Sequence, residues 1–208
     1  TTVNTDIKAY ASRDNGTTFT QITLADQGFL LPNPGNDEFT RLMLHCDGSN
    51  SGTTFTDTSD EAHTVTANGG AITSTTQKKF GTASMYTSGN SDFLSIPNSA
   101  DFNFGNGDFT IDAWIYHTGT TGYQTIATGT NTAHSTYWQF RYFGADGRFD
   151  FWVTGDTNGV TFAPGSQLTV NTWNHLAISR NGNNWYGFVN GAKIGATQVN
   201  SFTITDVD

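Results

Sequence analysis

Two Asn-Gly dipeptides that lie close together constrain the fold of this chain more than any other feature of its sequence. A strand-like run, Trp173 to Ser179, leads to Asn181-Gly182, and a second run, Trp185 to Val189, leads to Asn190-Gly191. Asn-Gly supplies the positive φ angles that a two-residue type I′ turn requires, so each dipeptide is typical of a tight hairpin. The segment therefore predicts a β-meander.

The composition agrees with an all-β chain. The sequence contains 16 Phe, 7 Tyr, 5 Trp and 23 Gly, whereas only 13% of the residues are charged. Aromatic residues favour pleated surfaces, and so few charges leave almost no Glu–Lys pairs to stabilise helices. Beyond residue 41, apolar runs recur about every ten residues with turn residues between them, which is typical of a sandwich or barrel. We predict two packed antiparallel sheets, with no α-helix longer than about two turns in residues 41–204.

Turn residues divide the chain into three parts. Residues 1–28 predict a β-hairpin that turns at Asp14-Asn15-Gly16. Residues 29–40 predict a linker, because Pro32 and Pro34 remove backbone donors and favour extended backbone. Residues 41–208 predict the main domain. Its expected strands are Leu42 to Cys46, two weak strands at Val65 and Ile72, Ala83 to Tyr86, Phe93 to Ile96, Phe109 to Tyr116, Thr125 to Ala127, Tyr137 to Phe143, Phe149 to Val153, Val160 to Phe162, and the runs from Trp173 and Trp185.

Alternation along three of these strands assigns their two faces, because successive strand side chains point to opposite sides of a sheet. The predicted core residues, which include two from the Trp173 run, are Phe109, Ile111, Ile115, Phe140, Phe149, Phe151, Leu176 and Ile178. The residues predicted to form a polar-aromatic outer surface are Asp112, Trp114, Gln139, Arg141, Asp150 and Trp152.

Several short motifs occur in a recognisable order and spacing. They are Phe80 to Tyr86 (FGTASMY), Phe93 to Pro97 (FLSIP), Gly107 to Ile111 (GDFTI), Trp-x-His-Leu-Ala from Trp173, and Val189-Asn190-Gly191. Together they resemble laminin G-like domains of the concanavalin A-like lectin/glucanase superfamily, over about residues 41–204. The resemblance implies an antiparallel β-sandwich with jelly-roll topology.

The resemblance also implies a closing strand after the Val-Asn-Gly hairpin, which would pair near the first strand. The chain stops at Asp208, and a jelly roll without this strand would expose an unpaired edge. We therefore expect the domain to lack its closing strand and to be part of a longer polypeptide. The segment Ser12 to Thr20 resembles tail-fibre or other virion proteins of bacteriophages, which implies a virion surface.

Charge and composition argue against several classes of partner. The single cysteine does not indicate whether the protein resides in an oxidising or a reducing compartment. The net charge of −9 argues against nucleic acid and against an anionic membrane surface, which both require clustered Lys and Arg. No apolar run reaches the roughly 18 residues of a membrane span, so we expect no membrane insertion. Cys46 is the only cysteine, so the chain forms no internal disulfide, and its apolar surroundings predict a buried strand residue.

The motifs for catalysis are missing from the sequence. Glycoside hydrolysis normally requires two carboxyl groups about the scissile bond, and laminarinase-like members of the superfamily place them in a Glu-x-Asp-x-x-Glu pattern. Glu38 and Glu61 lie in a predicted linker and loop, and Asp112 can approach Asp150 only if their strands are neighbours. There is also no Gly-x-Ser-x-Gly elbow, and the five histidines lack metal-ligand spacing. We therefore expect no enzymatic activity.

Calcium is the best metal candidate. A hard cation takes six to eight oxygen ligands, and laminin G-like domains often hold calcium at a loop rim. The carboxylates that crowd one loop region here are Asp47, Asp57, Asp60 and Glu61. The alternative is that these are solvated loop carboxylates without a ligand role.

Sugar binding is the remaining functional signal, because aromatic rings stack on sugars while polar groups fix the hydroxyls. Trp152 is the central candidate, and the other proposed ligand-binding residues are Asp150, Arg141, Gln139, Arg148 and Tyr137. Tyr123 and His134 are expected at the rim of the site, on loops. The alternative is that Trp152 and Trp114 are covered by another segment.

These observations favour a non-enzymatic, lectin-like adhesion module that binds a glycan or polysaccharide, at an extracellular or virion surface. The alternative is a structural or decoration domain that contacts other virion or surface subunits.

Overall fold

The computed structural model describes residues 9–11, 20–22, 38–119, 122–131, 137–144, 147–154, 159–163 and 168–204. These residues form fourteen β-strands and one 3-10 helix, η1 (Ala100–Phe102), and they include no α-helix.

Near the N-terminus, β1 (Ala9–Ala11) pairs antiparallel with β2 (Thr20–Ile22), as expected of a hairpin. The domain boundaries at residues 28 and 40 stay predictions. No helix in the described part of the chain is long and apolar enough to cross a membrane.

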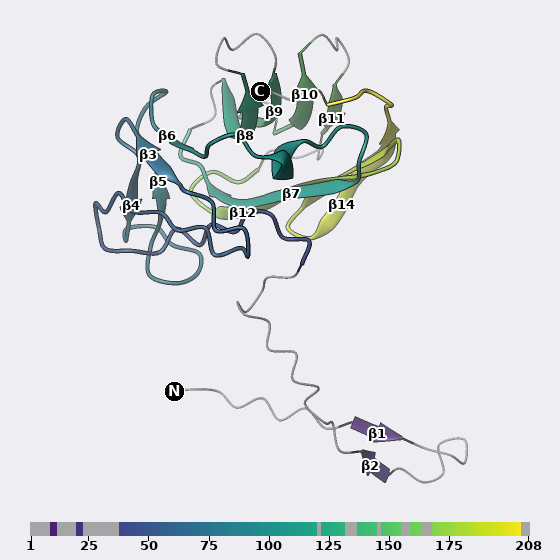
Figure 1. Ribbon diagram of the computed structural model, residues 1–208, viewed down its shortest axis with the longest axis horizontal. Coiled ribbons are helices and arrows are strands. Elements are labelled where there is room, and N and C mark those ends of the chain that lie inside the picture. The colour runs from purple at the N-terminus through teal and green to yellow at the C-terminus, as the bar shows by residue number, and fades with distance from the viewer. Residues whose placement is uncertain are drawn as a thin grey trace.

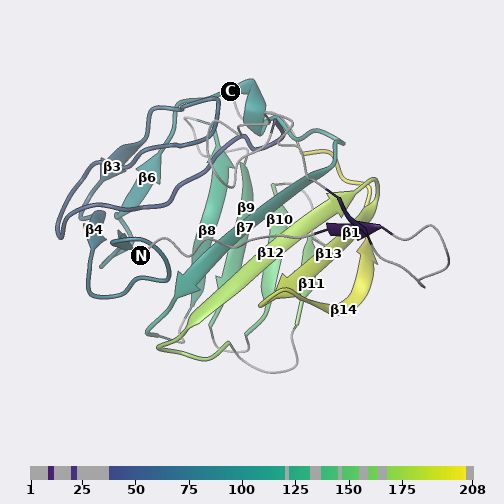
Figure 2. The same cartoon turned by 90° about the horizontal axis from the view of Figure 1, so that it is seen from below.

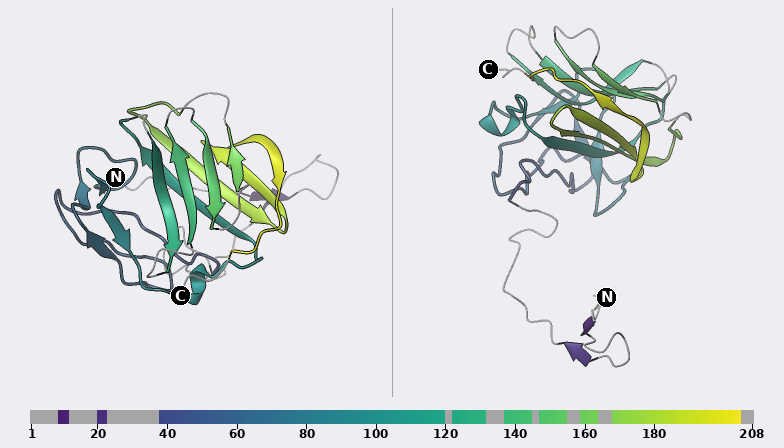
Figure 3. Two further views of the ribbon diagram at one scale, coloured as in Figure 1. Left: turned by 90° about the horizontal axis from the view of Figure 1, so that it is seen from above. Right: turned by 90° about the vertical axis from the view of Figure 1, so that its right-hand side faces the viewer.

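Two four-stranded antiparallel sheets form the sandwich. One sheet has the order β11-β10-β9-β8, built from β8 (Tyr123–Thr130), β9 (Tyr137–Phe143), β10 (Phe149–Val153) and β11 (Val160–Phe162). The other has the order β14-β13-β12-β7, built from β7 (Phe109–Tyr116), β12 (Trp173–Asn181), β13 (Asn184–Val189) and β14 (Ala192–Val199). The strands of the two layers cross diagonally when the sandwich is seen from either face (Figures 2 and 3). The predicted pair of packed antiparallel sheets is confirmed.

The predicted meander is β12–β13–β14, and only its first turn differs from the prediction. The first turn lies one residue later than expected, because Asn181 still pairs with Asn184, and Gly182 takes the positive φ of 58°. At the second turn Asn190 and Gly191 have φ of 50° and 80°, as a type I′ turn requires. This turn leads into β14, which the predicted set of strands did not include.

Residues 66–95 form a smaller lobe beside the sandwich (Figure 1). In this lobe β3 (Thr66–Asn68) pairs with β6 (Phe93–Ser95), and β4 (Ile72–Ser74) pairs with β5 (Ser84–Tyr86).

The strand predicted at Leu42 to Cys46 is wrong. This segment makes only an isolated bridge, between Leu44 and Asp57. Cys46 has a φ of 57°, which ends the extended run, and it is half-buried rather than buried. In addition, the backbone N–H of Met43 donates to the Asp57 carboxylate instead of to a neighbouring strand.

The core lies between the two sheets and is largely aromatic. Phe140, Phe149 and Phe151 from one sheet meet Leu176 and Ile178 from the other, and all five are fully buried. The remaining predicted core residues, Phe109, Ile111 and Ile115, are partly buried and pack against this cluster. They are less covered because β7 is an edge strand of its sheet.

Candidate functional site

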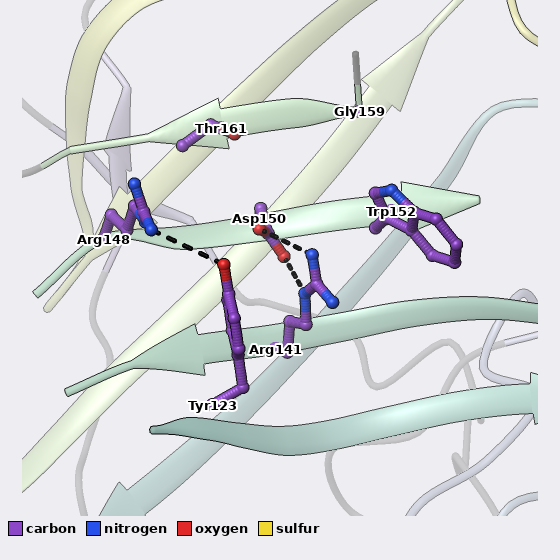
Figure 4. A pocket seen from close by; sticks show the side chains of 7 residues that line it. All are labelled: Tyr123, Arg141, Arg148, Asp150, Trp152, Gly159 and Thr161. Carbon is purple, nitrogen blue, oxygen red and sulfur yellow. Dashed lines mark hydrogen bonds and ion pairs between the residues drawn. The ribbon is translucent and has the colours of Figure 1, made fainter. Parts of the chain in front are cut away.

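A depression of about 410 Å³ opens on the outer face of the β8–β11 sheet, opposite the core. Its lining, drawn in Figure 4, consists of Tyr123, Arg141, Arg148, Asp150, Trp152, Gly159 and Thr161. The lining is mainly polar in character, with one aromatic ring from β8 and another from β10.

Strand alternation and register explain why these side chains meet. In β10, Phe149, Phe151 and Val153 enter the core, so Asp150 and Trp152 point outward. Asp150 pairs with Arg141 on β9 and with Thr161 on β11. Directly opposed strand residues lie about 5 Å apart, so the register alone places these three side chains side by side.

Arg141 and Asp150 form a two-pronged ion pair at the centre of the depression. Arg141 Nε donates to Asp150 Oδ1 at 2.7 Å, and Nη2 donates to Oδ2 at 3.2 Å. The two side chains are only 19% and 11% exposed. Arg141 Nη1 also donates to Gln139 Oε1 at 3.4 Å. Such a paired guanidinium and carboxylate present fixed donors and acceptors in one plane.

Two aromatic rings stand beside this ion pair. The Arg141 guanidinium carbon lies 4.3 Å from the centroid of the Tyr123 ring and 5.6 Å from the Trp152 ring. Arg148 Nη2 approaches the Tyr123 hydroxyl at 3.5 Å, and its guanidinium lies 4.8 Å from the Phe143 ring. Tyr123 is 49% exposed, whereas Trp152 is half-buried. The rings therefore offer apolar surface next to charged hydrogen-bonding groups.

Gly159 lets the backbone pass close to Trp152. A Cβ atom at this position would lie 2.6 Å from the Phe151 carbonyl oxygen and 3.4 Å from Trp152 Cδ1. Any larger residue would have to displace β10 or the indole ring, so glycine keeps this wall of the depression in place.

Four of the six predicted ligand-binding residues line the depression: Arg141, Arg148, Asp150 and Trp152. Gln139 lies beside them as a partner of Arg141. The side chain of Tyr137 and the whole of His134 lie outside the described residues. Tyr123 was expected on a loop, but it begins β8.

Gly159 and Thr161 also line the depression, but they were not among the predicted site residues. For Thr161 a signal existed, because it alternates with Val160 and Phe162, which are both buried. Its strand also follows β10 directly along the chain, which favours a hairpin partner. For Gly159 no pattern in the sequence indicated the close approach of the backbone.

Asp112 and Trp114 face outward as predicted, but on the other sheet from Asp150 and Trp152. They lie on β7, in the other sheet, where His175 Nε2 is 3.0 Å from Asp112 Oδ1 and the Trp114 and His175 rings are 5.2 Å apart. Asp112 and Asp150 therefore project from opposite outer faces of the sandwich. They do not form a pair of carboxylates about one site.

Three of the four carboxylates predicted to hold calcium, Asp47, Asp57 and Glu61, have separate partners. Asp47 accepts hydrogen bonds from the backbone and hydroxyl of Thr82, which lower its pKa below the ordinary value. Glu61 pairs with Arg41, and Asp60 is exposed.

Asp57, the fourth of these carboxylates, is buried within its own loop. Burial opposes its ionisation, but backbone N–H groups of Met43, Ser59 and His63 donate to it and hold its pKa below the ordinary value. Among the described residues no three His, Cys, Asp or Glu side chains are grouped to hold a metal ion. Calcium stays a prediction, and the described geometry supplies no ligand set for it.

Two packed antiparallel sheets of four strands each place this chain among the β-sandwich proteins. The chain belongs to the concanavalin A-like lectin/glucanases superfamily, whose family model matches residues 88–207. This match confirms the resemblance seen in the sequence motifs. Comparison with curated proteins gives no significant match.

Seven solved chains are similar to this one, of which three are as follows. The first is domain 4 of AbnA, a GH43 extracellular arabinanase from Geobacillus stearothermophilus, in complex with arabinotriose; it is 17% identical over 72% of this chain and 71% of that chain, with a TM-score of 0.54. The others are an S-layer domain-containing protein from Clostridium thermocellum (23% identity, 74% and 70% covered, TM-score 0.43) and the carbohydrate-binding module CBM66 from Bacillus subtilis (12% identity, 54% and 68% covered, TM-score 0.38). The first likeness supports the fold, and none of the three assigns a ligand to this chain.

Proposed function

We propose that this protein is a non-enzymatic carbohydrate-binding module and that the depression on the β8–β11 sheet is its sugar site. The observation that carries the proposal is the pairing of Arg141 with Asp150 between the rings of Tyr123 and Trp152 (Figure 4). Sugar sites combine a few oriented polar groups with an aromatic platform, and this lining supplies both.

The ion pair keeps hydrogen-bonding capacity after its own bonds are made. Arg141 has five N–H groups, of which three are used on Asp150 and Gln139, so two remain. Each Asp150 oxygen accepts one of these bonds and has a second lone pair. Adjacent sugar hydroxyls act as both donor and acceptor, so they match this arrangement. Thr161 adds one more hydroxyl from β11.

The same lining argues against hydrolysis. Canonical glycosidases place two carboxyl groups on either side of the bond that breaks. Asp150 is the only carboxylate among the seven lining residues, and both of its oxygens are bonded to Arg141. The described depression therefore suits binding rather than cleavage.

The proposed setting is an extracellular or virion surface, where the module would act in adhesion. Support comes from the lectin-type family and from the similar domain of an extracellular arabinanase, which was solved with arabinotriose. Arabino-oligosaccharides are accordingly the first ligands to try, followed by a broad glycan array.

The experiment compares wild-type protein with Trp152→Ala on the array and by calorimetry with the best ligand. Trp152→Ala should weaken binding at least about tenfold, or about 1.4 kcal/mol, because the stacking surface is lost. Trp114→Ala is the matched control, since it removes an exposed tryptophan from the opposite sheet. Equal binding by wild type and Trp152→Ala, or a loss only in Trp114→Ala, would contradict the assignment.

A structural role is the second candidate function. Several aromatic side chains of the smaller lobe are exposed, including Phe80 at 65%, Tyr86 at 50% and Phe93 at 50%. Exposed apolar surface of this kind occurs at protein interfaces. A protein that binds no glycan on the array but forms defined oligomers through these residues would favour a contact with other virion or surface subunits.

A further inference from the structure

We propose that Trp114 and Phe80 form a second ligand site, away from the depression, and that this site takes a quaternary ammonium group such as that of choline. The inference goes beyond the proposed function and does not depend on it, since neither residue lines the depression. It is based on two perpendicular rings and on the lysine ammonium that stands over them.

The two rings come from different parts of the fold. The smaller lobe borders one end of the edge strand β7 (Figure 2). Trp114 lies on β7, and Phe80 lies between β4 and β5 of the lobe. Their ring centroids are 5.6 Å apart and their planes are inclined at 85°, so the rings form the two walls of a corner. Phe80 is 65% exposed and Trp114 is 37% exposed, which leaves the corner open to a small ligand from solvent.

The ammonium of Lys79 stands over this corner. Its Nζ atom lies 4.2 Å from the Trp114 ring centroid and 5.7 Å from the Phe80 ring centroid. In the described part of the chain this ammonium has no carboxylate partner, and the two rings are its contacts. The face of an aromatic ring carries the negative part of its quadrupole, so the corner attracts positive charge.

A quaternary ammonium suits the corner better than a lysine does. A lysine ammonium carries three N–H donors and is strongly hydrated, whereas ring faces are only weak acceptors. A trimethylammonium group has no N–H donor, so it gives up no hydrogen bond to water when it moves onto the rings. Aromatic faces recognise choline-like groups through this cation–π interaction.

The charges beside the corner are complementary to a cation. Asp112 precedes Trp114 by two residues on the same face of β7, which is about 7 Å along the strand. Its side chain is 56% exposed, and its Oδ1 atom lies 3.0 Å from His175 Nε2. This separation is within the Debye length of about 8 Å at physiological salt, so the carboxylate attracts a cation toward the corner. The centres of protein interfaces are instead depleted of Lys and Asp, so this surface favours a small cation over a protein partner.

The test is a titration with choline, followed by NMR. Choline should bind in about the millimolar range, because cation–π contacts at exposed sites are individually weak. Dimethylbutanol, in which a carbon replaces the charged nitrogen of choline, should bind at least about fivefold more weakly. Ethanolamine, which carries a strongly hydrated primary ammonium, should also bind more weakly than choline.

Variants then locate the site. Phe80→Ala and Trp114→Ala should each lower the choline affinity at least about fivefold, and urea unfolding checks that both variants fold. Lys79→Ala should raise the affinity at least about twofold, because it removes the ammonium that competes for the corner. Lys193→Ala is the matched control and should change nothing, since Lys193 lies 5.3 Å from the single ring of Tyr186.

Several outcomes would overturn the inference. They are equal binding of choline and dimethylbutanol, a lower choline affinity in Lys79→Ala, and no choline binding by Lys79→Ala at about 100 mM. Binding of a trimethyl-lysine peptide without binding of choline would overturn it as well. A defined oligomer that buries Phe80, with no choline binding, would favour the structural role instead.

Two further measurements complete the test. Phosphatidylcholine vesicles that sediment with wild type, but not with Trp114→Ala, would support the site and assign a lipid headgroup as the source of the choline. Binding of soluble choline without vesicle binding would support the site and assign a soluble carrier. Glycan binding should be the same in Phe80→Ala, Lys79→Ala and wild type, so the sugar site and the choline site can each fail while the other holds.

Discussion

Arg141 and Asp150 face each other across β9 and β10, joined by hydrogen bonds of 2.7 Å and 3.2 Å on a solvent-facing side of the sheet. Both side chains are less than one-fifth exposed. Removing one partner would leave the other charge partly buried without its main contact, which costs more than the pair contributes.

The first prediction concerns this pair. Asp150→Asn should lower the free energy of unfolding by about 1.5–3 kcal/mol, since a charge-assisted bidentate contact is lost. Urea unfolding of Asp150→Asn, Arg141→Gln and the double variant measures the coupling between them. The double variant should lose less unfolding free energy than the two single variants lose together. Additive effects would show that the two side chains are not energetically coupled.

The second prediction concerns the aromatic core. Phe151 is fully buried, and its ring lies 5.2 Å from Trp185 and 5.5 Å from both Trp138 and Phe109. Phe151→Ala should cost about 3–5 kcal/mol of unfolding free energy because it leaves a cavity between the sheets. Phe93→Ala is the matched control at a half-exposed position, where about 0.5 kcal/mol is expected. Similar losses of unfolding free energy in Phe151→Ala and Phe93→Ala would contradict the burial of Phe151 between the sheets.

The third prediction concerns the contact between the two sheets at Gly187. A Cβ atom there would lie 2.5 Å from Cγ of Phe162, whose ring is buried in the facing sheet. Gly187→Ala should destabilise the protein by about 1–3 kcal/mol through overpacking. Gly119→Ala, which meets no atom within 4 Å, should change stability by no more than about 0.5 kcal/mol. Thermal or urea unfolding distinguishes the two, and a neutral Gly187→Ala would contradict the spacing of the sheets.

The fourth prediction concerns pH. The pKa of Asp57 is lower in the folded protein than its ordinary value, because the opposing effect of burial is outweighed by hydrogen bonds from Met43, Ser59 and His63. A depressed folded pKa means that the stabilisation is complete above the unfolded value of about 3.9 and is lost as pH falls through the folded pKa. Wild type should therefore exceed Asp57→Asn in stability at about pH 7, by about 1–3 kcal/mol.

The difference in unfolding free energy between wild type and Asp57→Asn should narrow below about pH 4. Unfolding measured in urea at about pH 7 and about pH 3 tests the narrowing. Gly119→Ala, which removes no titratable group and meets no atom within 4 Å, serves as the control and should show no such pH dependence. A constant difference between wild type and Asp57→Asn at both pH values would show that the carboxylate's charge is not what stabilises this loop.

Several features of the fold were predictable from local sequence pattern. Phe149, Phe151 and Val153 enter the core and Asp150 and Trp152 leave it, because strand side chains alternate with a period of two wherever the strand lies. The turn at Asn190-Gly191 was predictable for a similar reason, since its positive φ angles are a property of the two residues themselves. The same alternation, with Arg141 on a neighbouring strand, pointed to four residues of the candidate site.

Features that depend on which strands become neighbours were decided only by the tertiary structure. Asp112 and Trp114 alternate just as Asp150 and Trp152 do, yet they lie on the other sheet, because alternation carries no information about sheet membership. The carboxylates of Asp47, Asp57 and Glu61 are close in sequence, but each is bonded to a different partner. Register is set by contacts between residues far apart in the chain, so the joining of Asp150 to both Arg141 and Thr161 exists only in the folded sandwich.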